Sequence, residues 1–250
     1  AFYPENYTHY NFSKSKIRTL LMKLYFRPLI QSLRATGLSE GSSLLDIGSG
    51  SGEKAAFLRD ELGIDVIGLE PNGGASKKAL EIFDVKTIND FFPSKKLGNK
   101  KFDVIYLNHV IEHVPDPLNL LREIYNHLKP GGYLYGETEN SDALSAKFFG
   151  KYWSLYHMPF HLYFFTNQTL SALFRKVDFG ELQVQTSWDP SCIPISISNW
   201  TRRNKKPNEI PGPKINFYMV KMFFWLPLSF LDRPRGPVLK FQARRPINSQ

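Results

Sequence analysis

The chain has 250 residues, of which 42% are hydrophobic, and its formal net charge is +9. This length and apolar content suffice for one sizeable core, so we expect one domain with an elaboration. The single cysteine, Cys192, excludes an intrachain disulfide and fits a reducing, cytoplasmic compartment. The positive charge favours acidic partners such as phosphate groups, nucleic acid or an anionic membrane surface.

The first forty residues predict a helix that follows an aromatic segment. Residues 1–12 are aromatic and polar without a regular period and show no signal-peptide pattern. Apolar residues then recur at helical spacing among lysines and arginines as far as Gly37, and Pro28 is expected to kink or restart this helix. Three interpretations are open: a lid over a bound ligand, a basic helix that faces a membrane, and an ordinary helix packed on a sheet.

The most informative stretch is LLDIGSGSG, at residues 44–52. It predicts the end of a buried strand, a tight turn and the start of a helix at Glu53. Glycine suits such a turn because it tolerates positive φ and lets a ligand approach the backbone. Gly48, Gly50 and Gly52 therefore predict the floor of a small-molecule site, with an ordinary strand-to-helix turn as the alternative.

The charges around this turn indicate the kind of ligand. A dinucleotide fingerprint leaves the helix N-terminus free for pyrophosphate, but its last position is occupied here by Glu53. That carboxylate would repel a pyrophosphate, and Asp46 adds a second negative charge. Glu70 ends the next predicted strand, close to the spacing of about 20 residues at which an acid binds ribose hydroxyls. Together the acids favour a nucleoside that carries a positive charge.

Beyond this turn the sequence alternates between strand and helix patterns. Such alternation predicts parallel strands joined by right-handed crossovers, with ligands at the carboxyl ends of the strands. Asp116 is expected to cap the helix after the fourth strand, with Pro117 at its first position and Pro-Gly-Gly at 130–132 to end it. The expected strands are residues 44–47, 65–69, 85–88, 102–107, 133–137, 181–188 and 238–243, and the expected helices are 53–62, 73–82, 117–128 and one from 166.

Four motifs occur in the order typical of one enzyme class: DIGSGSG, Glu70 followed by Pro71, FDVIYLNHVIEHVPDP, and LKPGG. With them, residues 44–188 resemble the class I S-adenosylmethionine-dependent methyltransferases. EHVPDP and HMPFHLYFFTNQTL are most similar to the broad group that includes ubiquinone-biosynthesis O-methyltransferases and many enzymes of glycan and natural-product clusters. The resemblance implies S-adenosyl-L-methionine as the cofactor and leaves the acceptor open.

The resemblance also implies the fold. It is an α/β, Rossmann-like, seven-stranded and mostly parallel sheet with helices on both faces and an antiparallel last strand at the sheet's edge. We expect a single methyltransferase domain over residues 1–250. Its parts are a helical lid (1–40), a cofactor-binding core (41–188), an insertion or cap between strands six and seven (189–236), and the last strand with a tail (237–250).

The family's cofactor contacts carry over to named positions. By resemblance, Asp90 approaches the adenine amino group, Phe91 the adenine ring and Asn108 the methionine part of the cofactor. Methyltransferases of amino groups on nucleic-acid bases carry an acid or Asn followed by two prolines after strand four. This chain has His109 and Val110 after Asn108, which argues against base methylation. The expected cofactor-binding residues are Asp46, Gly48, Ser49, Gly50, Gly52, Glu70, Pro71, Asp90, Phe91 and Asn108.

The expected chemistry depends mainly on alignment, because a sulfonium is already an activated methyl donor. A hydroxyl acceptor must also lose its proton, and histidine has a suitable pKa for that step. The candidate bases are His113 and His161, with His109 third. For Glu112 and His113 the alternative is a structural role in holding the loop after strand four. An amine or a stabilised carbanion as acceptor would not need a base.

A metal ion and a thiol are not expected in this chemistry. His157 and His161 have the i, i+4 spacing of metal ligands on a helix, but Pro159 between them argues against a regular helix. No third ligand is evident near them in the sequence, so we predict no metal site. Cys192 lies far from the strand motifs, which argues against a catalytic thiol.

Residues 189–236 are the least regular part of the sequence. Residues 189–213, which include the basic run TRRNKK, predict a loop, and residues 215–231 are strongly apolar. This apolar segment is shorter than the about 20 residues of a membrane span and is broken by Lys221 and Pro227. A cap on the domain, a wall of an acceptor pocket and a segment in a membrane interface remain open.

These observations together predict a soluble S-adenosylmethionine-dependent methyltransferase. Its expected acceptor is small or lipid-linked, through a hydroxyl oxygen of a sugar or hydrophobic metabolite, in the cytoplasm with a peripheral contact at the membrane face. One alternative, favoured by the charge of +9 and TRRNKK, is an RNA or protein methyltransferase. Another is a non-catalytic module that binds S-adenosylmethionine. Nucleic acid is disfavoured as a partner, and the oligomeric state is left open.

Overall fold

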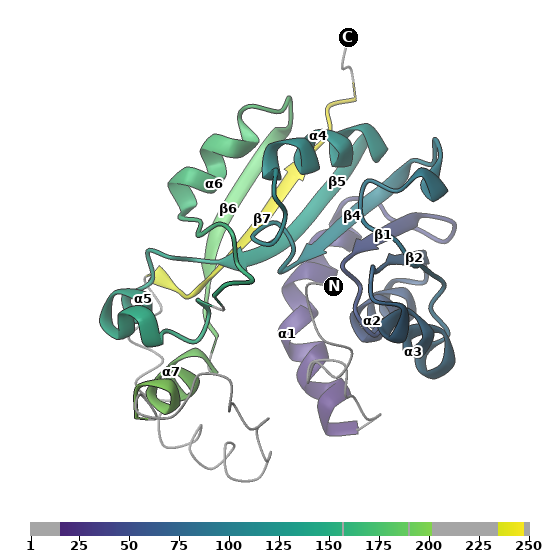
Figure 1. The fold of residues 1–250 in the computed structure, drawn as a ribbon. Coiled ribbons are helices and arrows are strands. Elements are labelled where there is room, and N and C mark those ends of the chain that lie inside the picture. Colours follow the sequence, from purple (N-terminus) through teal and green to yellow (C-terminus); the bar gives the residue numbers. More distant parts are fainter. Residues whose placement is uncertain (1–15, 157, 190, 202–234, 248–250) are drawn as a thin grey trace. The chain divides into compact units, whose positions relative to one another are not determined.

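The computed structural model describes residues 16–156, 158–189, 191–201 and 235–247 (Figure 1). The chain divides into two compact units. The first comprises residues 1–108, 123–134 and 244–250, and the second comprises residues 109–122 and 135–243. The expected cofactor-binding residues all belong to the first unit, and the three candidate bases belong to the second.

Parallel strands form the centre of the first unit. β1 (Ser43–Ile47) pairs with β2 (Asp65–Leu69) on one side and with β4 (Phe102–Asn108) on the other. β2 pairs in turn with β3 (Thr87–Ile88), and all three pairings are parallel. Most residues of β1 and β4 are buried, which explains why both strands read as nearly continuous apolar runs.

The helices of the first unit begin and end close to the predicted residues. α1 (Lys16–Ala35) continues through Pro28, so the helix does not restart there. α2 (Glu53–Leu62) ends at Gly63, which has a φ of 66° and donates its N–H to the carbonyl of Arg59. The remaining helices are α3 (Gly73–Phe83), capped by the Asn72 side chain, and the 3-10 turn η2 (Lys95–Leu97).

α4 (Pro117–His127) begins as the sequence predicts, because the Asp116 carboxylate accepts the N–H of Asn119. β5 (Leu128–Glu139) follows directly, so the expected strand start at residue 133 is too late. A Cβ on Gly132 would lie 2.9 to 3.1 Å from three backbone carbonyl oxygens. The strand therefore needs glycine here for close packing, whereas the sequence pattern suggested a glycine that ends a helix.

The second unit contains the later helices and strands. α6 begins with a capping box in which Thr166 and Thr169 exchange side-chain to backbone hydrogen bonds. The elements are α5 (Leu144–Phe149), η3 (Gly150–Tyr152), α6 (Asn167–Phe174), β6 (Gly180–Ser187), α7 (Cys192–Thr201) and β7 (Val238–Arg244).

The strands form one seven-stranded sheet in the order β3-β2-β1-β4-β5-β7-β6. Backbone hydrogen bonds join Gly131 to Arg245 at one end of the β5–β7 pair and Asn140 to Pro237 at the other, so β7 is antiparallel to β5. The expected Rossmann-like, mostly parallel sheet with an antiparallel last strand is confirmed. The expected edge position of that strand is wrong, because β7 lies between β5 and β6. The half-exposed, alternating pattern of β6 fits its place at the edge.

The predicted loop at residues 189–213 is wrong where α7 lies. Cys192, Ile193 and Ser196 are buried, and Ser196 Oγ donates to the carbonyl of Cys192 at 2.7 Å. Burial against α5 stabilises a helix whose serines and β-branched residues have only modest helix propensity.

Several predictions concern residues outside those that the structure describes. They are the aromatic segment at 1–12, most of the run TRRNKK, and the apolar residues 215–231. None of the helices in the described ranges combines the length and the apolar character that crossing a membrane requires.

Candidate functional site

The carboxyl ends of the parallel strands gather the expected cofactor-binding residues of the first unit. Ile47 at the end of β1 pairs with Leu69 of β2 and with Leu107 of β4. Leu69 pairs in turn with Ile88 at the end of β3. Three residues that follow these strands, Gly48, Glu70 and Asn89, and the last residue of β4, Asn108, therefore lie along one edge of the sheet, where ligands of this architecture bind.

The glycine-rich turn is shaped for close approach. Gly48, Gly50 and Gly52 all have positive φ values, between 55° and 79°. Gly48 donates its N–H to the carbonyl of Leu69 at 2.8 Å, which holds the turn against the end of β2. Ser49 Oγ is buried and makes no hydrogen bond within the described ranges. A polar ligand on this turn would give that hydroxyl a partner.

Glu70 connects the turn to the loop after β2. Its carboxylate accepts the N–H of Gly50 through one oxygen and the N–H of Asn72 through the other, each at 2.9 Å. Burial raises the pKa of Glu70, and these two hydrogen bonds oppose the rise. A carboxylate has about four acceptor sites, so two remain for the hydroxyls of a ribose. Pro71 follows in the same loop, where its carbonyl accepts the Asn89 amide.

Asp46 is buried at the end of β1 and is 2% exposed. Burial raises its pKa to about 7, the charge of Glu70 acts in the same direction, and Lys54 opposes both. A positively charged ligand would favour the ionised form of this carboxyl. The two acids that the sequence assigned to a cationic nucleoside therefore lie at the same sheet edge with their pKa values raised.

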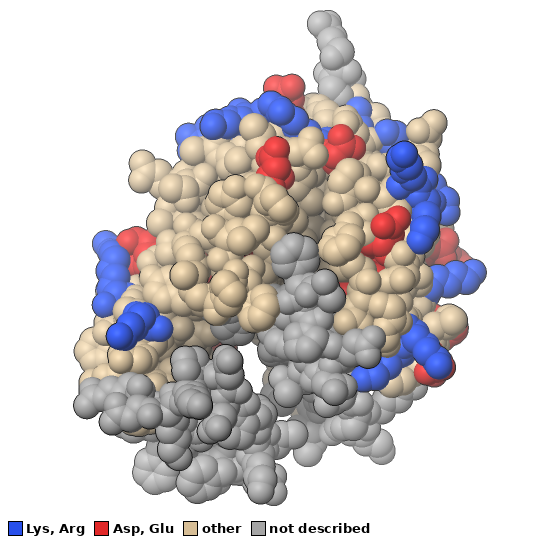
Figure 2. Space-filling model, in the orientation of Figure 1, with Lys and Arg blue, Asp and Glu red and all other residues tan. Residues whose placement is uncertain are grey.

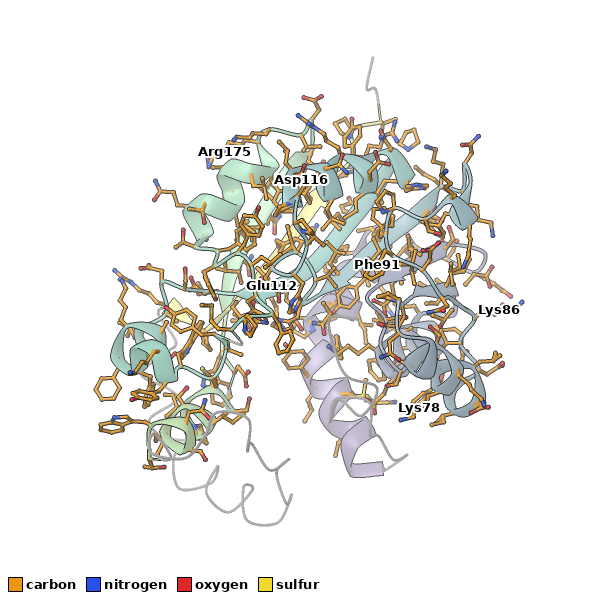
Figure 3. The ribbon with its side chains drawn as sticks, in the orientation of Figure 1. Lys78, Lys86, Phe91, Glu112, Asp116 and Arg175 are labelled. Carbon is orange, nitrogen blue, oxygen red and sulfur yellow. The ribbon has the colours of Figure 1, made fainter. Side chains whose placement is uncertain are left out.

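The loop after β3 is held by its own acid. Asp90 accepts the N–H of Phe91 at 2.9 Å and the hydroxyl of Ser94 at 2.8 Å. These hydrogen bonds, that of Ser94 first, lower the pKa of Asp90. The ring of Phe91, labelled in Figure 3, is 59% exposed and therefore offers a surface for stacking. Contacts of Asp90, Phe91 and Asn108 with the cofactor stay predictions.

The second unit contains a buried group of charged side chains. His109 Nδ1 lies 3.2 Å from Glu112 Oε1 and 2.9 Å from Glu139 Oε1. Thr138 Oγ1 lies 2.9 Å from the second oxygen of Glu112 and 3.3 Å from that of Glu139. Glu112, labelled in Figure 3, and Glu139 are 0% and 3% exposed. The hydrogen bonds therefore link both carboxylates to one imidazole and one hydroxyl.

Electrostatics fixes His109 as the cation of this group. Burial alone would lower the pKa of His109, but the charges of Glu139 and Glu112 and their hydrogen bonds raise it well above its usual value. Burial tends to raise the pKa of Glu139, but the charge and hydrogen bond of His109, together with hydrogen bonds to Glu112 and to the backbone, lower it. Burial and the charge of Glu139 raise the pKa of Glu112. A protonated His109 beside an ionised Glu139 is the result.

The other two candidate histidines lie beside each other. The rings of His113 and His161 have centroids 4.5 Å apart and meet edge to face. His161 is 5% exposed, and its Nδ1 lies 3.7 Å from Glu139 Oε1. His113 Nδ1 lies 2.9 Å from the carbonyl of Phe160, and the carbonyl of Glu112 accepts the N–H of Leu162. The loop after β4 therefore holds the aromatic segment that contains His161.

The same side chains are of the types that bind divalent metals. Glu112, His113 and His161 form one group, and His109, Glu112 and Glu139 a second, with ligand atoms within 4.8 Å of one another in each. The sequence shows no third ligand near His157 and His161 along the chain, and the structure brings Glu112 and His113 to His161 from a distant part of the sequence. The absence of a metal stays a prediction, and hydrogen bonds to His109 and Thr138 already satisfy the carboxylates without one.

Sequence reasoning named the three histidines and Glu112 as candidates, and it placed Thr138 and Glu139 at the same edge of the sheet without giving them a role. Both lie at the end of β5, and the N–H of His109 bonds to the carbonyl of Glu137 in the same strand. The rule that ligands gather at the carboxyl ends of strands gives this placement, but it does not give the contacts of the two side chains with His109 and Glu112. His157 lies outside the described residues.

Comparison with known proteins gives the family. The profile described as a methyltransferase domain matches residues 18–184, which is more than half of the chain. The chain belongs to this methyltransferase family. This confirms the resemblance and supports S-adenosyl-L-methionine as the cofactor of the first unit's site.

Individual relatives of this methyltransferase agree with that assignment. The ubiquinone biosynthesis O-methyltransferase of Aliivibrio fischeri is 33% identical over 137 residues, which are 49% of this chain and 58% of that protein. The chain thus spans about half the length of the curated relatives that it matches.

Solved structures show a similar fold. Phosphoethanolamine N-methyltransferase 2 of Haemonchus contortus, in complex with S-adenosyl-L-methionine, has a TM-score of 0.57 and 21% identity and covers 86% of this chain and 51% of that chain. A SAM-dependent methyltransferase from Archaeoglobus fulgidus has a TM-score of 0.58 and 20% identity, with 90% and 94% covered.

Replacing Glu70 by Ala should remove most of the cofactor affinity. The variant loses the ribose acceptor and two hydrogen bonds that shape the loops, and we expect binding of S-adenosylmethionine to weaken at least about tenfold, as for loss of a charged hydrogen bond. Titration calorimetry measures this directly. Glu81→Ala, on the outer part of α3, is the matched control. Unchanged affinity in Glu70→Ala would refute the cofactor site.

Asp46 should make the stability of the cofactor-free protein depend on pH. Because its folded pKa is about 7, against an ordinary value of 3.8, the folded state keeps a proton that the unfolded state loses. The contribution of Asp46 to stability should therefore fall as the pH rises from about 4 to 7. Asp46→Asn should flatten this fall in denaturant titrations, whereas Asp65→Asn, an exposed position, should not. Equal slopes for the parent and Asp46→Asn would contradict the assignment.

Proposed function

We propose that this methyltransferase transfers the methyl group of S-adenosyl-L-methionine to a hydroxyl oxygen of a small or lipid-linked acceptor, such as a sugar or a hydrophobic metabolite. The supporting observation is the buried His161, which lies beside Glu139 and against the ring of His113. A carboxylate beside an imidazole stabilises the imidazolium that forms when the ring takes a proton. His161 is the proposed base.

The three histidines have different proposed roles. His109 is held as a cation between two carboxylates, so it cannot accept a further proton, and its role is to balance the charge of Glu139. His113 bonds to the carbonyl of Phe160 and contacts the ring of His161, so it positions that ring. His161 alone of the three combines burial with a carboxylate at 3.7 Å and a neighbouring aromatic wall.

Apolar surroundings support a hydrophobic acceptor. The ring of Phe164 lies 6.5 Å from that of His161 and 5.0 Å from that of Tyr156. Phe160, Leu162 and Tyr163 in the same segment are 36% to 47% exposed. Large apolar side chains beside a candidate base can bind the carbon skeleton of an acceptor and keep water from the reacting oxygen.

Nitrogen acceptors are the nearest alternative chemistry. Phosphoethanolamine N-methyltransferases of Arabidopsis thaliana and Haemonchus contortus are among the similar proteins, beside the ubiquinone O-methyltransferases. An amine at neutral pH presents a lone pair after a single deprotonation in solution and needs no strong base. The choice of oxygen rests on the His161 and Glu139 pair.

The experiment that tests the function is transfer of labelled methyl from S-adenosylmethionine into a cell extract, separated into lipid, soluble, nucleic-acid and protein fractions. We expect label in the lipid or soluble fraction. Label confined to RNA or protein would favour a macromolecular substrate, and cofactor binding without label in any fraction would favour a non-catalytic module.

A chelator arm of the same experiment tests the metal-independent mechanism. Treatment with a chelator should leave the transfer rate unchanged, because protons on His109 and Thr138 satisfy the buried carboxylates. Loss of transfer that a divalent ion restores would mean that these side chains hold a metal.

His161→Asn should lower kcat at least about a hundredfold, which is the low end of the effect of a general base. Cofactor affinity should stay unchanged, because His161 is not among the residues expected to bind the cofactor. His127→Asn, on α4, is the matched control. Normal turnover in His161→Asn would indicate an acceptor that needs no base.

A further inference from the structure

α5 and α7 form a pair with a well-packed inner side. Their buried cluster comprises Ala143, Ala146, Phe149, Trp153, Cys192 and Ile193. Ser145 Oγ of α5 lies 3.7 Å from Cys192 Sγ of α7. The segment after η3 binds both helices: Trp153 Nε1 donates to Ser145 Oγ at 3.0 Å, and the N–H of Ser154 donates to Ser196 Oγ at 2.9 Å. Packing of the buried side chains therefore fixes which side of the helix pair faces outward.

The outer side of this pair, which we call the α5–α7 face, is apolar and exposed. Phe148 is 76% exposed, Trp200 44% and Leu144 43%. A cavity of about 220 Å³ opens between aromatic rings, and it is lined by Phe148, Phe149, Tyr152 and Trp200. Single apolar residues scattered over a surface are common and need no explanation. Exposed apolar side chains that cluster around a hollow are typical of an interaction surface.

Positive charge borders the α5–α7 face. Lys147 and Lys151 lie on the same short segment as Phe148, and Lys151 Nζ lies 5.3 Å from the centre of the Tyr152 ring. Asp142 lies 2.6 Å from Lys147 and 3.8 Å from Arg235. Together with Lys151, these residues carry three positive charges and one negative charge. Figure 2 shows Lys and Arg side chains over α5. Residues 143–156 and 191–201 contain no acidic residue.

The sequence that follows α7 has a similar character. Four basic residues occur within residues 202–206, and residues 215–231 are apolar and rich in aromatic side chains. Trp, Tyr and Phe beside Lys and Arg are the composition of segments that lie in a bilayer interface, where the rings enter the boundary and the cations meet lipid phosphates.

We propose that the α5–α7 face docks on a bilayer that contains anionic phospholipid. Phe148 and Trp200 enter the interface, Lys147 and Lys151 lie at the headgroup phosphates, and a segment of acyl chain fills the cavity between the rings. Charge complementarity favours a bilayer over an apolar protein partner, because Lys147, Lys151 and Arg235 outnumber Asp142 beside this face. The inference concerns the surface and does not depend on the identity of the methyl acceptor.

Vesicle sedimentation tests the proposal with the full chain. We expect binding to vesicles of phosphatidylcholine with a quarter phosphatidylglycerol, and weaker binding to pure phosphatidylcholine. Phe148→Ser combined with Trp200→Ser should weaken partitioning at least about tenfold, whereas Leu80→Ser, at a position that is 55% exposed on α3, should not. Lys147→Gln with Lys151→Gln should abolish the preference for anionic vesicles, and Lys77→Gln with Lys78→Gln should leave it intact.

A spectroscopic readout places the contact on this face. Brominated lipids should quench tryptophan fluorescence in the parent chain, and Trp200→Phe should remove part of that quenching without weakening binding much. Methyl transfer to a water-soluble acceptor should be the same in the parent and the face variants. Absence of vesicle binding, equal binding by face and control variants, or dimers in light scattering that the face variants abolish would each overturn the proposal.

Discussion

Parallel register is the constraint on which the cofactor half of the molecule depends. Because Ile47 pairs with both Leu69 and Leu107, three strands end at one level and their following residues meet at one edge. The bond from Gly48 N–H to the Leu69 carbonyl fixes that level. A slip of one residue in β2 would turn the side chains of the strand to the opposite face and carry Glu70 away from Gly50. The site is thus a property of the sheet as well as of the motif.

Burial of charge is the corresponding constraint in the second unit. Two nearly inaccessible carboxylates lie beside each other, which is costly unless cations and donors face them. His109 supplies the positive charge and Thr138 a hydroxyl donor. The backbone carbonyl of Glu112 accepts N–H groups from the aromatic segment, so the electrostatic balance and the position of His161 are linked. A substitution of one member of this group should therefore change the protonation or position of the others.

The features that the sequence predicted correctly are local ones. Examples are the turn glycines, the Asp116 cap and the end of a helix at Gly63. Each depends on residues within a few positions, so the sequence itself indicates it. The errors have a tertiary origin. Gly132 is required by packing against backbone carbonyls, and α7 owes its helix to burial against α5.

The candidate base site shows where sequence reasoning ends. His109, Glu112 and His113 are neighbours in the chain, so their proximity could be predicted from the sequence. Their contacts with Glu139 and His161 cross from the loop after β4 to the end of β5 and to the aromatic segment. Nothing in the spacing of those residues specifies that contact, because the path of the intervening chain decides it.

The position of Cys192 has a practical consequence. This thiol is the sole one in the chain, is 1% exposed, and lies 3.4 Å from Ser154 Oγ inside the packed α5–α7 pair. Thiol reagents react with accessible thiolates, so in the folded protein Cys192 is shielded from alkylation. A cysteine introduced at any exposed position would then be the only group to take a maleimide probe, which makes the natural chain a ready background for spin or fluorescence labelling.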